Sequence, residues 1–189
     1  DLANKVYHVW RNNTPNRSRG VRITVSTSCF VPKSHTPFQW EGQNTQEEYL
    51  RKVTLLRENL RNKSITYNWH DPETSFLEAV LSRGDRRIAD VIEEAWRHGA
   101  KFDSWSEYFS LQTWMDAFAA CGVDPTFYAN RLRDREEVFP WTVISDGVTE
   151  KFLWREREQA YAGKITPDCR EKCSGCGANR LCEGGICHA

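Results

Sequence analysis

The sequence lacks long apolar runs and an excess of either charge. None of its apolar segments approaches the roughly 18 residues of a membrane-spanning helix, and its first residues lack the hydrophobic region of a secretory signal. Lys plus Arg and Asp plus Glu both number 26, so the formal net charge is zero. This balance argues against a membrane or a nucleic acid as a partner held mainly by electrostatic attraction. We therefore expect a soluble, cytoplasmic protein.

Cysteine is also scarce over most of the chain, where only Cys29 and Cys121 precede residue 169. The other five of the seven cysteines follow as Cys169-x₃-Cys173-x₂-Cys176-x₅-Cys182-x₄-Cys187. A disulfide framework would spread its cysteines over the elements that it joins. Thiolates only a few residues apart instead converge on one soft ion or cluster. The tail therefore predicts a metal site that holds zinc or an iron–sulfur cluster.

Two short segments, residues 21–27 and 65–69, alternate apolar and polar residues as β-strands do. Between them, Thr45 and Glu48 form a capping box ahead of a helical pattern. A strand, a helix and a strand in this order predict two parallel strands joined by a crossover. Two parallel strands do not make a stable sheet by themselves. We therefore expect the remainder of a longer polypeptide, or a partner, to complete the sheet.

Helical periodicity dominates from residue 71 onward. Four helices each follow a candidate capping residue, namely Asp71, Asp85, Ser110 and Asp124. A last helix is expected over residues 148–162. Within these helices, Trp96, Trp114 and Phe118 fall on apolar stripes, so we expect them in the core. The sequence thus predicts an α+β fold that is mostly α.

The segment after the first strand is polar and is stiffened by Pro32 and Pro37. Ligand sites in parallel α/β proteins lie at the carboxyl ends of strands, where Phe30, Lys33 and His35 would lie. These three residues are therefore candidates for a substrate-facing loop. A plain extended connection, stiffened by its prolines, is the alternative interpretation.

Several stretches of the chain resemble one known family. They are residues 23–40 (ITVSTSCFVPKSHTPFQW), 69–87 (WHDPETSFLEAVLSRGDRR), 152–156 (FLWRE), 166–169 (TPDC) and 173–177 (CSGCG). The family comprises bacterial radical S-adenosylmethionine iron–sulfur proteins with a cobalamin-binding-like N-terminal domain. The resemblance implies radical generation from S-adenosylmethionine by an iron–sulfur cluster, and it implies no particular substrate.

The resemblance further implies that the chain is the C-terminal portion of such an oxidoreductase. Residues 1–70 would be the βαβ end of an α/β barrel, residues 71–163 a helical accessory region, and residues 164–189 a cysteine-rich tail with an auxiliary metal site. The S-adenosylmethionine site would lie only in the full-length protein. We therefore do not expect this chain to be catalytic by itself.

The spacing Cys169-x₃-Cys173-x₂-Cys176 equals that of the radical-generating motif of the superfamily. That motif follows the first barrel strand and usually has an aromatic residue before its third cysteine, whereas Gly175 precedes Cys176 here. We therefore interpret the tail as a separate site for a 4Fe-4S cluster or zinc. Its four expected ligands are Cys169, Cys173, Cys176 and Cys187, and Cys182 or His188 is an alternative to Cys187.

Two other functions stay open at this point. Zinc in the tail, without a redox role, would make the chain a structural or interaction module. The hypothesis that the chain is a nucleic-acid-modifying subunit has two supports. Some relatives within the superfamily act on tRNA, and residues 11–22 form a basic stretch. A solvated loop is the alternative interpretation of that stretch.

Overall fold

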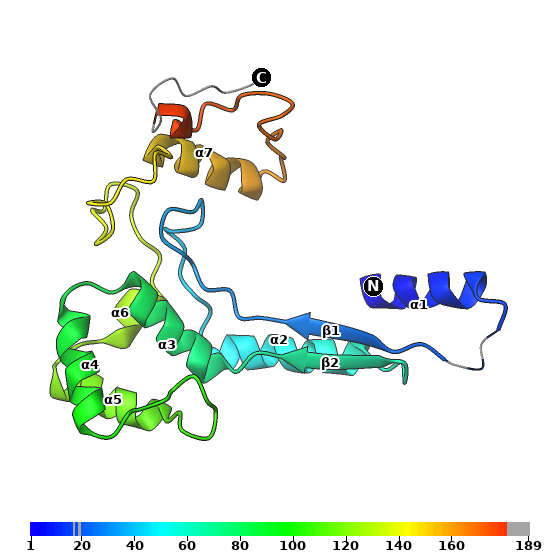
Figure 1. Cartoon of the computed structure of the whole chain (residues 1–189), viewed down its shortest axis with the longest axis horizontal. Coiled ribbons are helices and arrows are strands. Elements are labelled where there is room, and N and C mark those ends of the chain that lie inside the picture. Colours follow the sequence, from blue (N-terminus) through cyan, green and yellow to red (C-terminus); the bar gives the residue numbers. More distant parts are fainter. Residues whose placement is uncertain (17, 19, 181–189) are drawn as a thin grey trace. The chain divides into compact units, whose positions relative to one another are not determined.

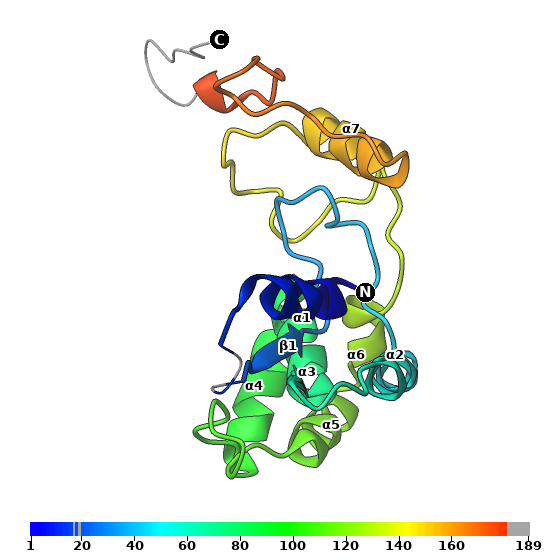
Figure 2. The same ribbon diagram turned by 90° about the vertical axis from the view of Figure 1, so that its right-hand side faces the viewer.

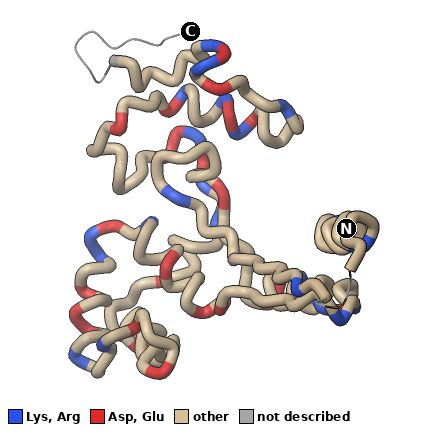
Figure 3. Tube along the Cα trace, turned by 45° about the vertical axis from the view of Figure 1, so that its right-hand side comes forward, with Lys and Arg blue, Asp and Glu red and all other residues tan. Residues whose placement is uncertain are grey.

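The structure is a computed structural model that describes residues 1–16, 18 and 20–180. Over these residues the protein is α+β and mostly helical, as predicted, and basic and acidic residues are interspersed along the trace (Figure 3). The elements in chain order are α1 (Leu2–Asn13), β1 (Ile23–Thr27), α2 (Gln46–Asn59), β2 (Ile65–Trp69), α3 (Pro72–Arg83), α4 (Arg87–Arg97), α5 (Leu111–Ala120), α6 (Pro125–Ala129), α7 (Glu150–Tyr161) and the short 3-10 helix η1 (Ala178–Arg180). No helix in this described part is both long and apolar enough to cross a membrane.

The chain divides into two compact units. The first contains Asp1–Phe30 and Asn44–Phe76, and the second contains Val31–Gln43 and the residues from Leu77 onward. The loop that follows β1 therefore leaves the unit of its own strand and packs within the other unit. Each unit is described by itself below.

The first unit contains the predicted βαβ segment. β1 and β2 pair in parallel, from Ile23 opposite Ile65 to Thr27 opposite Trp69, and α2 runs along the pair (Figure 1). The side chain of Thr45 accepts the backbone N–H of Glu48 and so caps α2, as predicted. Within the described residues the sheet consists of these two strands. α1, which we did not predict, also lies in this unit and contains no buried residue.

The second unit contains the predicted helices, several of them capped by the predicted side chains. Ser110 accepts the N–H of Thr113 at the start of α5, and Asp124 accepts the N–H of Thr126 at the start of α6. The central helices α4 and α5 pack against each other (Figure 2). Their apolar faces make a core whose buried members include Val91 and Phe118.

One predicted core residue of α4 is not in the core. Trp114 and Phe118 are buried as expected, but Trp96 is 59% exposed, so that prediction was wrong. The buried face of α4 carries Val91 and Ala95. Because successive helical residues are rotated by about 100°, Trp96 points away from the face that Ala95 presents to the core.

Residues 31–43 are fixed in the second unit by backbone hydrogen bonds and by buried side chains. The N–H of Gln43 donates to the carbonyl of Ala129 at 2.8 Å, and the N–H of Arg133 donates to the carbonyl of Trp40 at 2.8 Å. Trp40 is fully buried in an apolar cluster with Phe139, Trp141 and Leu153. This cluster connects the loop to α7, which carries Leu153.

Candidate functional site

The segment that carries the described tail cysteines lies against α7 (Figure 2). Thr149 caps α7 with its side chain, which accepts the N–H of Phe152, while its own backbone N–H donates to the carbonyl of Cys176 at 2.8 Å. Farther along the helix, Arg155 Nη2 donates to the carbonyl of Ser174 at 2.6 Å. The Cys173–Cys176 turn is therefore held by the first turns of α7.

Two glycines give this turn its shape. Gly175 and Gly177 have φ angles of 70° and 101°, in the left-handed region that other residues rarely adopt. A Cβ atom on Gly177 would also lie 2.9 Å from the carbonyl oxygen of Gly147 and 2.8 Å from Cγ2 of Thr149. The sequence Cys173-Ser174-Gly175-Cys176-Gly177 therefore fits closely against α7 only because the last position is glycine.

The loop with Cys169 is closed by two side-chain hydrogen bonds. Thr166 Oγ1 donates to Glu156 Oε2 on α7 at 2.6 Å, and Ser174 Oγ donates to the carbonyl of Pro167 at 3.2 Å. These bonds bring the chain before Cys169 back to the segment after Cys173. Cys169 itself is exposed, whereas Cys173 and Cys176 are half-buried.

The thiols suit a soft metal ion or a cluster by their chemistry. Among the described residues, however, no group of three or more His, Cys, Asp or Glu side chains is close enough to hold a metal ion. The expected ligand Cys187 and its alternatives Cys182 and His188 lie outside the described residues. The fold thus brings Cys173 and Cys176 onto one anchored turn and leaves the complete ligand set a prediction.

The three candidate loop residues are divided between the two units. Phe30 is 50% exposed and belongs to the first unit, whereas Lys33 and His35 belong to the second. Lys33 Nζ forms an ion pair with Glu78 on α3. His35 has a positive φ of 55°, and its backbone N–H donates to Gln39 Oε1 at 3.0 Å.

His35 lines a cavity of about 180 Å³ beside α7. Its Nδ1 lies 3.9 Å from Asp146 Oδ2, and Gln39 Oε1 also accepts the indole N–H of Trp141 at 2.9 Å. Sequence reasoning missed Asp146 and Trp141, which are more than 100 positions from His35. No local pattern relates residues at that separation, although the Ser145-Asp146-Gly147 turn signal was readable.

No family model, curated protein or solved structure matches this chain.

Proposed function

We propose that the chain is the C-terminal portion of a radical S-adenosylmethionine iron–sulfur oxidoreductase and that its tail carries an auxiliary iron–sulfur cluster. The ligands would be Cys169, Cys173, Cys176 and Cys187. One observation carries the proposal: the Cys173–Cys176 turn is anchored on α7 through Thr149 and Arg155. An exposed loop without a ligand would have little reason to form this close contact, because ordering its backbone costs about 1–2 kcal/mol per residue.

The resemblance of residues 23–40 and 69–87 to the radical S-adenosylmethionine family favours iron–sulfur over zinc. When bound, the cluster would supply one-electron redox chemistry. The residues of this chain would fix its thiolate ligands and restrict the access of solvent from the side of α7. Cys173 and Cys176 are half-buried, which suits that role.

Zinc is the second candidate. The two-residue spacing between Cys173 and Cys176, with glycine at positions 175 and 177, is also typical of turns that bind one tetrahedral zinc ion. The chain would then be a structural or interaction module without a redox role. The two candidates differ in colour, in sensitivity to oxygen and in sulfide content.

In the proposed parent protein, the remainder of the polypeptide would complete the sheet of β1 and β2 and would supply the S-adenosylmethionine site. His35 would then face substrate from the loop after β1. The cavity with His35 and Asp146 supports this role because it places an imidazole and a carboxylate at one solvent-accessible wall.

The test is metal analysis of the chain purified without oxygen, with iron, sulfide and zinc determined per chain and a visible spectrum recorded. We expect iron and sulfide in equal amounts and broad absorption near 400 nm, as is typical of about four irons in a cluster. Cys173→Ala and Cys176→Ala should abolish both. Cys29→Ala and Cys121→Ala are matched controls outside the tail and should retain them.

One zinc per chain and a colourless protein would exclude the redox function and would support the second candidate, a structural or interaction module that zinc stabilises. Equal loss of metal in the Cys29 and Cys121 variants would contradict the assignment of the site to the tail. A chain without any bound metal after anaerobic purification, and after separate reconstitution with iron plus sulfide and with zinc, would refute both candidates.

A further inference from the structure

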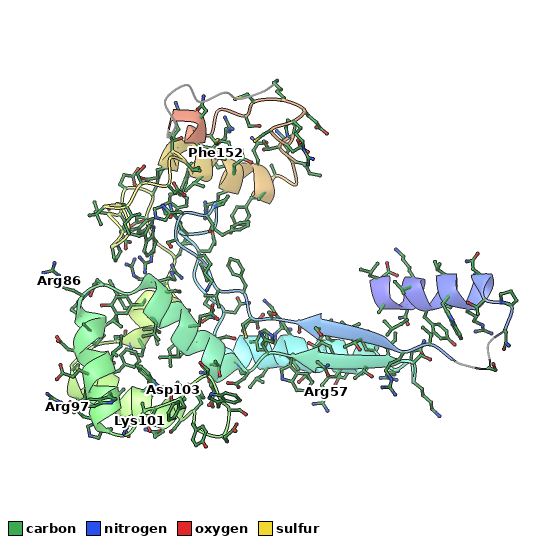
Figure 4. The ribbon with its side chains drawn as sticks, in the orientation of Figure 1. Arg57, Arg86, Arg97, Lys101, Asp103 and Phe152 are labelled. Atoms are coloured by element: carbon green, nitrogen blue, oxygen red, sulfur yellow. The ribbon has the colours of Figure 1, made fainter. Side chains whose placement is uncertain are left out.

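A second cavity lies beside the first turns of α7, separate from the one that contains His35. It measures about 420 Å³, within the range of small-molecule sites. Its walls include three basic side chains, Arg135, Lys151 and Arg155, and the rings of Phe152 and Trp154. Figure 4 shows Phe152 on α7, and Gly175 of the cysteine turn also lines the cavity.

The charge of this cavity is strongly one-sided in a chain that is neutral as a whole. Among the described residues, neither Arg135 nor Lys151 has a carboxylate partner within ion-pair distance. Glu158 is the acidic residue in the wall, and its Oε1 already accepts the indole N–H of Trp154 at 3.1 Å. Arg155 is already paired with Glu156, at 3.3 Å between Nη2 and Oε1. Among the described residues, Arg135 and Lys151 are therefore the two cations of the wall left to face a doubly charged anion.

The two aromatic rings hold the arginines in defined positions. The guanidinium of Arg135 lies 5.1 Å from the ring centroid of Trp154, and that of Arg155 lies 4.8 Å from the centroid of Phe152. Arg155 Nη2 is fixed further by the carbonyl of Ser174. A stacked guanidinium presents its N–H edge in a fixed plane, the geometry that recognises phosphate oxygens.

The helix itself favours an anion at this place. The N-terminus of α7, a helix of 12 residues, carries the positive end of the helix dipole, and Lys151 lies in its first turn. Gly175, which also lines the cavity, leaves open space, because a Cβ atom there would have no neighbour within 4 Å. The cavity thus combines a cationic end with aromatic surface and room for a planar group.

We propose that this cavity binds a nucleoside monophosphate. The phosphate would lie between Lys151 and Arg135, and the base would contact the ring of Phe152. Trp154 is already stacked by the guanidinium groups of Arg135 and Arg157, which lie 5.1 and 4.7 Å from its ring centroid. The phosphate supplies the double negative charge, and stacking of a base on an aromatic ring contributes about 1–3 kcal/mol. The proposal goes beyond the proposed metal function and holds whether the tail binds iron–sulfur or zinc.

The test is calorimetric titration of the full chain with AMP, with adenosine and inorganic phosphate as comparison ligands. We expect AMP to bind at least tenfold more tightly than either fragment, because it alone occupies both parts of the cavity. Lys151→Ala and Arg135→Gln should each weaken AMP binding about tenfold or more, the effect of losing one charge-assisted hydrogen bond. Lys164→Ala, an exposed lysine beyond the end of α7, is the matched control and should leave the affinity unchanged.

Three results would overturn the proposal. The first is the absence of AMP binding at millimolar concentration in a chain whose circular dichroism shows folded helices. The second is AMP affinity that is unchanged in both cavity variants, or reduced as much in Lys164→Ala. The third is inorganic phosphate or adenosine binding as tightly as AMP, since the cavity would then recognise only one part of the ligand.

Discussion

Arg83 at the end of α3 is fully buried, and its replacement tests how the second unit tolerates a buried charge. Its Nη1 donates to the carbonyl of Ala129 at 3.1 Å and its Nη2 to the carbonyl of Gln39 at 3.4 Å. Burial, and next the nearby guanidinium of Arg133, lower the pKa of Arg83 to about 10. The fold therefore disfavours the charge that Arg83 carries at neutral pH.

The magnitude follows from that pKa. A fall from the ordinary value of 12.5 to about 10 corresponds to roughly 3 kcal/mol, at about 1.4 kcal/mol per pKa unit. This cost is present in full below pH 10 and disappears as the pH rises from 10 towards 12.5, because over that range the folded protein has released the proton that the unfolded chain still holds. The hydrogen bonds to the carbonyls of Ala129 and Gln39 offset it at neutral pH.

Arg83→Met removes the charge and its cost, along with two hydrogen bonds. Ala129 keeps a partner for its carbonyl, because the N–H of Gln43 also donates to it at 2.8 Å. The lost bond to Gln39 is long. We therefore expect the free energy of unfolding of Arg83→Met to lie within about 2 kcal/mol of the wild-type value.

Arg83→Lys keeps the charge but loses the planar fork that reaches both carbonyls. We expect it to destabilise the protein by about 3–5 kcal/mol. The loss of stability cannot much exceed about 5 kcal/mol, because at that cost the buried lysine gives up its proton at pH 7 and becomes neutral. Urea unfolding at pH 7, followed by far-UV circular dichroism, measures the difference. Exposed Arg97 on α4 (Figure 4) provides the control: Arg97→Lys and Arg97→Met should both stay within about 0.5 kcal/mol of wild type.

Equal stability of Arg83→Lys and Arg83→Met would show that a buried charge without the guanidinium fork carries no cost at this position. A loss of 3 kcal/mol or more in Arg83→Met would show that the carbonyl contacts outweigh the desolvation of the guanidinium.

Three further predictions concern two glycines and one helix cap. Gly42→Ala should destabilise the protein by about 3 kcal/mol or more in urea unfolding, because its Cβ would lie 2.1 Å from the carbonyl oxygen of Asn130. The control is Gly122→Ala, which has a φ of 64° and open space around its Cβ and should cost only about 1–2 kcal/mol. Gly177→Ala should lower the metal content of the tail, and Gly163→Ala, which shares the positive φ but has no close neighbour, should not; equal effects would contradict the close fit to α7. Asp71→Ala should cost about 1 kcal/mol, because Asp71 Oδ2 accepts the N–H of Thr74 at 2.9 Å, and an unchanged melting temperature would exclude this cap.

The elements of the fold were predictable because their signals are local. The alternation at residues 21–27 and 65–69 and the caps at Thr45, Ser110 and Asp124 each depend on neighbours only a few positions apart. α1 also has a local signal, which was missed: Leu2, Val6, Val9 and Trp10 recur at i, i+4, i+7 and i+8 behind Asp1, a residue type that often caps helices. The exposure of Trp96 was unpredictable, since it depends on which face of α4 meets α5.

The candidate sites were only partly predictable, for a related reason. The cysteine spacing identified Cys173 and Cys176 without any knowledge of the fold. The contact of their turn with α7 depends on Thr149 and Arg155, about 20 positions or more away, and the cavity of Arg135 and Lys151 depends on the same contact. Spacing in the sequence reveals ligand chemistry, but it does not reveal which helix a loop packs against.

Thr149 shows why the two sites near α7 depend on each other. Its hydroxyl caps the helix and its backbone N–H holds the carbonyl of Cys176, so one residue fixes both the start of the helix and the cysteine turn. Any ligand that binds the ordered turn more tightly than the disordered one stabilises that contact by mass action, and through it the first turn of α7. Lys151, in the first turn of α7, lines the second cavity. A metal in the tail would therefore also favour the conformation of α7 that the proposed anion site requires, although the two ligands share no side chain.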